Sequence, residues 1–347
     1  MSGAFSVKRG HNFDGYAKSK EGKVERHRMN SHKGISAGIF LVLTACFATV
    51  MPSQLLGQET RQNSTRHNAQ AVFTATPTPA RLARGRYLVE TVSGCLDCHS
   101  AHEYVNNQWI VKPGMKAAGR IFAPSYLPLP PKSEVVAPNI TPDRETGIGS
   151  WTDAQIEKAI RHGVAKGGRP LFDLMPYWQF AVLSNEDIRS IIVYLRSLPP
   201  VHNALPTTRL PFPVRVDKEP PLVEPLPKDP SLEVRRGWYL TRIAGCSDCH
   251  TPLLPHGRRP ASLVFAGGMS FHGPFGVAVS LNITPSASGI GSMTEAEFSR
   301  TLRTGRVDGT GRTLSPVMPY DRFKNLKEAD IRAIYAYLRT VPPVPHN

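Results

Sequence analysis

The sequence predicts an all-α protein built from two tandem copies of one small domain, joined by a proline-rich linker. Three observations support this fold class. A Cys-x-x-Cys-His motif occurs at Cys95–His99 and again at Cys246–His250. Short sequences around the two motifs recur in the same order, and the apolar residues between them follow helical spacing. The 347 residues suffice for two such domains and an N-terminal extension.

The repeat defines the expected domain boundaries. Arg-Gly-Arg-Tyr-Leu ending at Leu88 returns as Arg-Gly-Trp-Tyr-Leu ending at Leu240. Further matches are Asn-Ile-Thr-Pro from Asn139 and Asn282, Met-Pro-Tyr from Met175 and Met318, and Asp-Ile-Arg from Asp187 and Asp330. These matches are 143 residues apart, whereas the Cys motifs are 151 apart, so the second copy is about eight residues shorter after its Cys motif. We expect domains at residues 81–200 and 230–347.

Each copy is expected to contain a helix leading into the Cys motif, a second helix after a long loop, and a third helix at its end. The second helix begins near Thr152, where Gln155 completes a capping box, and its counterpart uses Thr294 and Glu297. The third helix has an apolar stripe and stops at two prolines. Its stripe residues are Ile188, Ile191, Ile192, Leu195 and Leu198, repeated as Ile331, Ile334, Tyr335, Leu338 and Val341.

The linker between the copies is expected to cover residues 201–229. Ten prolines lie between positions 199 and 230. Because proline restricts the backbone and favours extended structure, this composition predicts a semi-rigid spacer rather than a flexible one. A stiff spacer would keep the two copies near one another.

Residues 1–57 are expected to be an export signal or a membrane anchor. The apolar, uncharged residues 34–51 follow a basic stretch, as in an export signal, and are near the lower limit for spanning a bilayer. Leu-Thr-Ala-Cys ending at Cys46 resembles a lipoprotein cleavage site, so Cys46 is either an acylated first residue or a small apolar residue of the signal. A start at Met29 would give a shorter basic region. The polar residues 58–80 predict a flexible tether.

Cys-x-x-Cys-His is the attachment signature of c-type haem. Two cysteines three apart on a helical turn can both form thioethers with one haem, and the adjacent His can bind its iron. The expected haem-binding residues are Cys95, Cys98 and His99 in the first copy and Cys246, Cys249 and His250 in the second. A redox Cys pair would need a thioredoxin-like context, and a zinc site would have to join two distant pairs. A structural disulfide would leave both histidines unexplained.

Met175 and Met318 are the expected sixth ligands of the two irons. They are the methionines that coincide in the repeat, and each precedes Pro-Tyr. A thioether ligand raises the reduction potential of a His-ligated haem. Competing ligands without a counterpart in the other copy are Met115, Met269, Met293, His102, His162, His202, His256 and His272. Tyr177 and Tyr320 either donate hydrogen bonds beside the Met loop or only pack, and Trp151 could donate to a haem propionate.

The formal net charge of +15 does not require a nucleic-acid-binding surface. Residues 1–33 hold eight Lys or Arg and three acidic residues, so part of the excess lies outside the two copies. Two haems would bring propionates that remove about four further charges at neutral pH. We expect a mildly basic surface that favours an acidic partner.

Residues 81–347 resemble class I cytochrome c domains, in particular those of the cytochrome subunits of bacterial membrane-bound alcohol, gluconate and sugar dehydrogenases. The motifs that carry the resemblance are Cys-x-x-Cys-His, Asn-Ile-Thr-Pro followed by Gly-Ile-Gly-Ser-Trp-Thr, Gly-Arg-Pro-Leu, Met-Pro-Tyr and Tyr-Leu-Arg-Ser-Leu-Pro-Pro-Val. The implied fold is two tandem class I cytochrome c domains, each with one covalently bound haem c. His99 and Met175 would ligate one iron, and His250 and Met318 the other.

The resemblance implies an electron carrier rather than an enzyme. It would pass single electrons from a periplasmic dehydrogenase to a cytochrome or oxidase of the respiratory chain, on the periplasmic side of the bacterial inner membrane. The sequence has two haem motifs where such subunits commonly have three, and no clear C-terminal membrane segment, so we expect a shuttle rather than a quinone reductase. Alternatives are a di-haem enzyme (a peroxidase or a thiosulfate-oxidising cytochrome) and a haem-based sensor. A Met in both copies argues against an open iron site.

Overall fold

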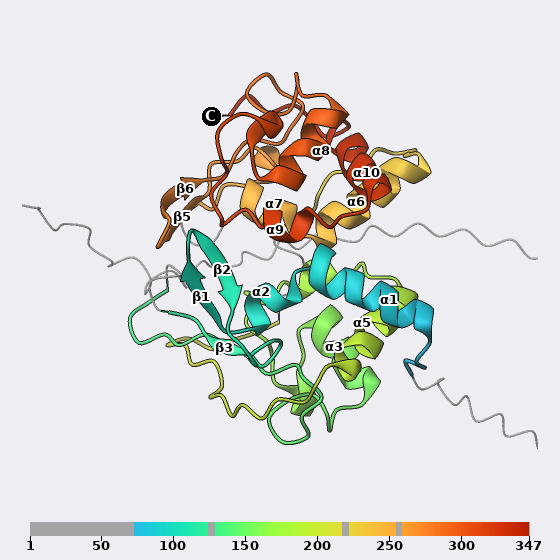
Figure 1. The fold of residues 1–347 in the computed structure, drawn as a ribbon, viewed down its shortest axis with the longest axis vertical. Coiled ribbons are helices and arrows are strands. Elements are labelled where there is room, and N and C mark those ends of the chain that lie inside the picture. The colour runs from blue at the N-terminus through green and yellow to red at the C-terminus, as the bar shows by residue number, and fades with distance from the viewer. Residues whose placement is uncertain (1–72, 124–128, 217–221, 255–258, 347) are drawn as a thin grey trace, which may run out of the picture. The chain divides into compact units, whose positions relative to one another are not determined.

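The computed structural model describes residues 73–123, 129–216, 222–254 and 259–346. All of them lie within one compact unit, His67–Asn347. The described part of this unit is rich in helices and contains three antiparallel sheets of two short strands each (Figure 1). Its helical character agrees with the prediction from the sequence.

Several expectations concern residues outside the described ones. These are the apolar segment 34–51, the acylation of Cys46, the alternative start at Met29 and the histidine His256. Only the end of the predicted tether is described, and there the Ala75 amide donates to the Asp153 carboxylate at 2.8 Å. None of the described helices has both the length and the apolar composition needed to span a bilayer.

The helices of the first repeat recur in the same order in the second. The first repeat contains α1 (Pro79–Tyr87), the π-helical turn η1 (Leu88–Val92), α2 (Cys95–His99), α3 (Asp153–His162), the 3-10 turn η3 (Lys166–Gly168), α4 (Tyr177–Phe180) and α5 (Asn185–Ser197). The second contains α6 (Leu232–Ile243), α7 (Cys246–His250), η5 (Ala261–Leu263), α8 (Glu295–Thr304), η6 (Val307–Gly309), α9 (Tyr320–Phe323) and α10 (Glu328–Leu338). The three expected helices of each copy are confirmed, and a short helix, α4 or α9, is added at Met-Pro-Tyr.

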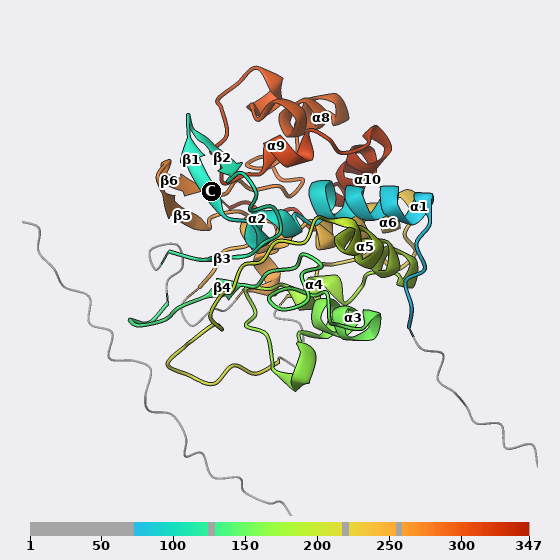
Figure 2. The same ribbon diagram turned by 60° about the horizontal axis from the view of Figure 1, so that its bottom comes forward.

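The strands are an addition to the all-α prediction. β1 (His102–Val105) pairs with β2 (Gln108–Val111), β3 (Arg120–Ile121) with β4 (Val136–Ala137), and β5 (Ser270–Gly273) with β6 (Gly276–Val279). Asn106 and Asn107 join β1 to β2 with φ values of 51° and 61°, the backbone that a tight hairpin turn requires. The hairpins β1–β2 and β5–β6 lie on the same side of the described unit (Figures 1 and 2).

The middle helix of each repeat begins where predicted. The Thr152 hydroxyl accepts from the Gln155 amide, and the Gln155 side chain accepts from the Thr152 amide at the start of α3. Thr294 and Glu297 form the same capping box at the start of α8. These boxes satisfy backbone N–H groups that have no partner within the helix.

The first and last helices of each repeat cross at a glycine. A β-carbon built on Gly85 in α1 would lie 1.9 Å from the backbone oxygen of Ser190 in α5. A β-carbon on Gly237 in α6 would lie 1.9 Å from the backbone oxygen of Ala333 in α10. Only glycine allows the helix backbones to approach so closely. The repeated Arg-Gly-x-Tyr-Leu sequence is therefore a packing motif that positions the Cys motif after it.

A π-helical turn compensates for a one-residue difference between the repeats. The first repeat has one residue more between Leu88 and Cys95 than the second has between Leu240 and Cys246. The Ser93 amide donates to the Leu88 oxygen, five residues earlier, at 2.8 Å. Because a π turn holds more residues than an α turn, it takes up the extra residue. Both Cys motifs then follow the same kind of glycine turn.

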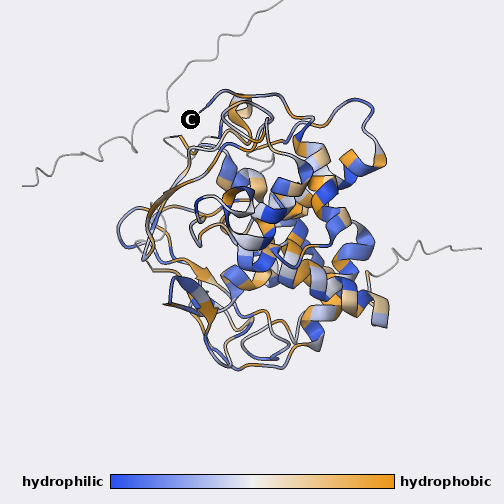
Figure 3. Ribbon diagram, turned by 45° about the horizontal axis from the view of Figure 1, so that its top comes forward, coloured by the Kyte–Doolittle hydropathy of each residue, from blue (hydrophilic) through white to orange (hydrophobic). Residues whose placement is uncertain are grey.

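The core lies between the inward faces of these helices, and polar residues occupy their other faces (Figure 3). Its fully buried side chains include Leu88, Ile188, Ile191, Ile192, Leu240, Ile243, Ile331 and Tyr337. The apolar stripes predicted for the third helices are therefore confirmed as core, except that Tyr335 is half-buried at its edge while Tyr337, outside the predicted stripe, is fully buried.

The two repeats exchange equivalent hydrogen bonds. The Tyr87 hydroxyl of α1 donates to Asp330 of α10 at 2.7 Å, and the Tyr239 hydroxyl of α6 donates to Asp187 of α5 at 2.6 Å. Each aspartate is also paired within its own repeat, to Arg84 or Arg236 of the Arg-Gly-x-Tyr-Leu motif. In each motif the arginine thus binds its own repeat and the tyrosine binds the other.

The proline-rich segment packs against both repeats. The Asn203 side chain donates to the Ala118 oxygen at 2.8 Å, and Arg209 forms a backbone bridge with Glu134. Further along, Glu224 is buried in an ion pair with Arg242 of α6. These contacts hold the described parts of the segment against loops of the first repeat and against α6 of the second.

Candidate functional site

Each Cys motif forms one short helix that starts after a glycine. α2 and α7 both begin at the first Cys and end at the His. The preceding residues, Gly94 and Gly245, have φ values of 60° and 74°, a left-handed backbone that favours glycine. Because residues three apart are neighbours on a helix, the two Cys side chains of each motif lie close together.

Both motif histidines are buried, and a backbone carbonyl orients each ring. Nδ1 of His99 lies 2.7 Å from the Pro138 oxygen, and Nδ1 of His250 lies 2.6 Å from the Leu281 oxygen. A carbonyl oxygen only accepts, so Nδ1 carries the proton and Nε2 keeps its lone pair. Burial lowers the pKa of both rings, which favours the neutral form that binds metals. Metal-ligating histidines usually donate their other N–H in this way.

The two carbonyls lie directly before the Asn-Ile-Thr-Pro loops. The side-chain oxygen of Asn139 accepts from the amide and the hydroxyl of Thr141, at 2.9 and 2.7 Å. Its side-chain nitrogen donates to the Val201 oxygen, beyond the third helix, at 2.7 Å. Asn282 makes the equivalent contacts in the second repeat. The sequence shows this motif as a repeat but not its role, which is to fix the loop that orients the histidine.

All four motif cysteines are free thiols. Burial raises the pKa of Cys98 to about 11 and that of Cys249 to about 12. The thiols are therefore protonated near neutral pH, unlike the low-pKa thiolate of a redox Cys-x-x-Cys pair. Among the described residues, no group of three or more His, Cys, Asp or Glu side chains could hold a metal ion.

The two Met segments have the same local structure. The Met175 amide donates to the Phe172 oxygen, and the Met318 amide donates to the Ser315 oxygen, both at 3.0 Å. Tyr177 and Tyr320 pack their rings against Gly163 and Gly305, the glycines that end α3 and α8. Both tyrosine rings therefore pack beside the Met segments. Met175 and Met318 both pack at the edge of the core.

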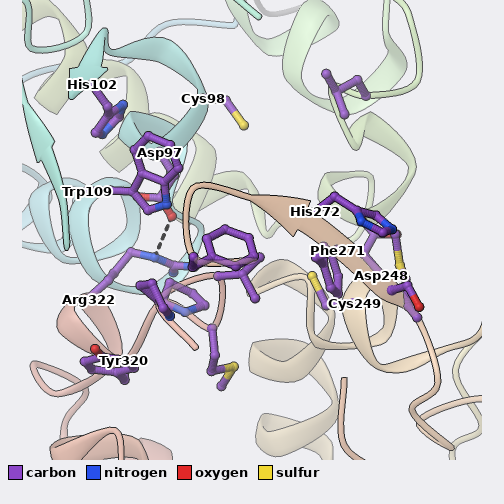
Figure 4. A pocket seen from close by; sticks show the side chains of 18 of the residues that line it. Asp97, Cys98, His102, Trp109, Asp248, Cys249, Phe271, His272, Tyr320 and Arg322 are labelled. Carbon is purple, nitrogen blue, oxygen red and sulfur yellow. Dashed lines mark ion pairs between the residues drawn. The ribbon is translucent and has the colours of Figure 1, made fainter. Parts of the chain in front are cut away.

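A cavity of about 830 Å³ lies beside the Cys motifs (Figure 4). Among the predicted haem-binding residues it is lined by Cys98, Cys249 and Met318. The others do not line it: Cys95, His99, Met175, Cys246 and His250. Trp109 of β2 and Phe271 of β5 also line it, so both hairpins contribute walls. Its size lies in the range of about 300–1,000 Å³ common for ligand pockets.

Three of the competing ligands also reach this cavity. His102, Met269 and His272 line it, and Nδ1 of His102 has no hydrogen-bond partner within the described part of the chain. His162 and His202 are exposed instead. The two hairpins, which the sequence did not predict, therefore contribute potential haem contacts to the cavity.

The residues at each motif fit a covalently bound haem. Two free thiols lie one helical turn apart, and the next residue is a buried histidine with Nε2 left available. The same set occurs in both repeats, and one cysteine of each motif lines the cavity. Cys95, Cys98 and His99 would hold one haem, and their counterparts in α7 the other.

Sequence reasoning did not single out Arg322, which lines the cavity in the second repeat. Its Nε lies 3.0 Å from a carboxylate oxygen of Asp97, between the cysteines of the first motif (Figure 4). The available signal is its place in the repeat, four residues after Met318. The first repeat has Gln179 at this position.

Comparison with known proteins supports the same class. The chain is 31% identical over 293 residues to the fructose dehydrogenase cytochrome subunit of Gluconobacter japonicus, covering 77% of this chain and 54% of that protein. It is 30% identical to the cytochrome c subunit of alcohol dehydrogenase (quinone) of Gluconobacter oxydans, with 77% and 56% covered. A protein named diheme cytochrome c-type from Cereibacter sphaeroides is 29% identical, with 72% and 83% covered. No protein-family model matches the chain.

The chain is thus homologous to c-type cytochromes. In particular, it is similar to cytochrome c subunits of fructose, alcohol and gluconate dehydrogenases, as its motifs predicted. It spans a little over half the length of the first two relatives. Homology therefore supports covalent haem and electron transfer in general.

Proposed function

We propose that this protein is a di-haem c-type cytochrome that transfers single electrons from a periplasmic dehydrogenase to a respiratory-chain acceptor. Its architecture would be two tandem class I cytochrome c domains, at residues 81–200 and 230–347, joined by the proline-rich linker. The observation that carries the proposal is the duplicated set of two free thiols and one carbonyl-oriented, buried histidine.

The side chains of the two sites would have separate roles. Cys95, Cys98, Cys246 and Cys249 would form the thioether bonds. His99 and His250, oriented by Pro138 and Leu281, would present Nε2 to the iron. Met175 and Met318 would be the sixth ligands. When bound, haem supplies an iron that changes its charge by one electron. Since no substrate bond breaks, no side chain has to act as acid or base, and the protein is an electron carrier rather than an enzyme.

The proposed location is the periplasmic side of the bacterial inner membrane. The basic and apolar pattern of residues 1–57 supports export. Attachment would occur through that segment or through acylated Cys46. The dehydrogenase named in several relatives supports a dehydrogenase as electron donor. A cytochrome or an oxidase would be the acceptor.

The first test is the haem content and the reduction potential of the protein matured in a bacterial periplasm. Mass spectrometry should find two covalently attached haems, and C95A/C98A or C246A/C249A should each remove one. A potentiometric titration followed by visible absorption should show two low-spin haems. Met175→His and Met318→His should each lower the potential of one haem, because a thioether ligand favours the ferrous iron.

The same preparation distinguishes the carrier from a di-haem enzyme. A carrier keeps both irons six-coordinate and does not react with hydrogen peroxide. A high-spin haem that reacts with peroxide would contradict the proposal and indicate a peroxidase. Attachment of fewer than two haems would contradict it directly.

A further inference from the structure

Arg322 of the second repeat binds the segment that leads into the first Cys motif. It lies in α9, four residues after Met318, and its side chain is 11% exposed. Its Nη1 donates to the Thr91 oxygen at 2.8 Å and to the Val92 oxygen, both in η1. Its Nε forms the ion pair with Asp97 in α2 (Figure 4). One guanidinium therefore fixes the haem-binding helix of the first repeat from the Met segment of the second.

The opposite contact also exists, but it has different chemistry. Gln179 of α4 is 1% exposed and lies against Gly245, where a built β-carbon would be 3.4 Å from its Oε1. In the first repeat, a β-carbon built on Gly94 would be 2.7 Å from Cζ of Arg322. The residue four positions after each Met thus covers the glycine before the Cys motif of the other repeat. At one site this residue is a cation, and at the other it is a neutral amide.

This difference matters because each contact lies at the start of a predicted haem-binding helix. The charge on a haem changes by one unit on reduction, so a nearby fixed positive charge favours the ferrous state. In a half-buried site water screens such a charge only in part. Arg322 also neutralises Asp97, whose negative charge would otherwise favour the ferric state. Arginine can bind a carboxylate and two carbonyls together because its donors are fixed in a plane.

We infer that Arg322 is a cross-repeat positioning residue, through which the second repeat holds the first haem-binding helix and raises the potential of the first haem. The inference rests on the proposed function, since it concerns the haem attached to Cys95 and Cys98. Met318 and Arg322 share one segment, so the segment that ligates one iron supports the attachment of the other. The two haems would then differ in potential despite having the same ligands.

The test is Arg322→Gln in the full chain, because glutamine is the residue at the equivalent position of the first repeat. Potentiometric titration of the two-haem protein should show a several-fold shift of the first haem towards its ferric form, larger than any shift of the second haem, because Arg322 makes its hydrogen bonds and ion pair with the first motif. The two redox steps are assigned with Met175→His, which marks the first haem. Arg322→Lys should recover part of the shift, because an ammonium keeps the charge but not the planar set of donors.

Arg303→Gln is the matched control. Arg303 also binds a carboxylate and two carbonyls, those of Glu328, Lys324 and Leu326, but all lie within its own repeat. Its loss should leave both potentials unchanged. The inference is overturned if R322Q carries two haems and the first haem keeps its potential, or if only the second haem shifts. If the unsubstituted protein itself carried fewer than two haems, that result would contradict the proposed function instead.

Discussion

Asp187 joins side chains from both repeats. Its carboxylate accepts from Arg84 at 2.8 Å and from Tyr239 at 2.6 Å. Burial raises the pKa of this carboxyl, but the hydrogen bonds from Arg84 and Tyr239 outweigh burial and hold its pKa below the ordinary value for aspartate. Its neighbour Glu186 pairs with Arg81 at the surface and is far more exposed. The charge of Asp187 should therefore contribute more to the free energy of unfolding than the charge of Glu186.

Asp187→Asn should lower the free energy of unfolding by about 1–3 kcal/mol near neutral pH, because the Arg84 charge loses its partner. The folded-state pKa of Asp187 lies below its unfolded value of about 3.9, so its contribution is complete above that pH and is lost as the pH falls through the folded-state pKa. The difference between D187N and the unsubstituted protein should therefore narrow in acid. Urea denaturation at neutral and acidic pH measures it.

Glu186→Gln is the control, and it should change the free energy of unfolding much less than D187N at neutral pH, because water screens an exposed ion pair. An equal effect of D187N at both pH values would contradict the role given to the Asp187 charge.

Single residues also mark the limits of prediction from sequence. The cysteines and histidines of the two motifs could be predicted as haem-binding residues because their spacing carries that chemistry. The carbonyls of Pro138 and Leu281 could not, because a backbone acceptor leaves no signature in the side chains. Arg322 was hidden for another reason: its partners lie more than 220 residues away, and its repeat counterpart is a glutamine.

At the scale of elements, the Asn-Ile-Thr-Pro loop connects the histidine of the Cys motif to the end of each repeat. Asn139 is 3% exposed and uses its side-chain oxygen and nitrogen in hydrogen bonds to Thr141 and Val201. Pro138, one residue earlier, accepts from His99. A substitution in this loop should therefore alter the orientation of His99 without changing any predicted haem ligand.

Asn139→Ala should lower the free energy of unfolding by about 1–3 kcal/mol, because it leaves buried donors and acceptors without partners. It should also shift the potential of the first haem, since the hydrogen bond that Nδ1 of His99 donates to the Pro138 oxygen tunes the basicity of the ring. Chemical denaturation and potentiometry measure the two effects.

Asn203→Ala is a suitable control, because Asn203 binds the nearby Ala118 oxygen and has no contact with the Pro138 carbonyl among those described. If N203A shifted the potential of the first haem as much as N139A does, the Asn-Ile-Thr-Pro loop would not be what connects this position to His99.

The elements themselves were predicted unevenly. The capping boxes at Thr152 and Thr294 and the apolar stripes of the third helices indicate helices through local, periodic chemistry, and all are present. The hairpins were missed because each strand has only four residues, too few for a clear alternation. The Asn-Asn pair at 106 and 107 was the available signal for the first of them.

At the scale of the whole molecule, the reciprocal Tyr87–Asp330 and Tyr239–Asp187 bonds and the Arg322 contacts make the two repeats one compact unit. We expect the haem-loaded protein to unfold in one cooperative calorimetric transition. Tyr87→Phe combined with Tyr239→Phe removes both cross-repeat hydroxyls at a cost of about 1 kcal/mol each. The double variant should broaden or split the transition.

Tyr104→Phe removes a hydroxyl that bonds Asn107 within its own hairpin, so it should leave the single transition intact. Persistence of one sharp transition in Y87F/Y239F would show that the two hydrogen bonds do not couple the repeats.

The exchange of tyrosine hydroxyls has a consequence for assembly. Each repeat offers the same donor and the same acceptor to the other, as subunits do in an isologous two-fold dimer. A single copy of the repeat would therefore carry a self-complementary face. It would pair with a second copy to an extent that depends on its concentration. Joining two copies in one chain makes the association intramolecular, at an effective concentration that the linker sets. Dilution cannot separate the pair, and each half is free to diverge, as positions 179 and 322 already have.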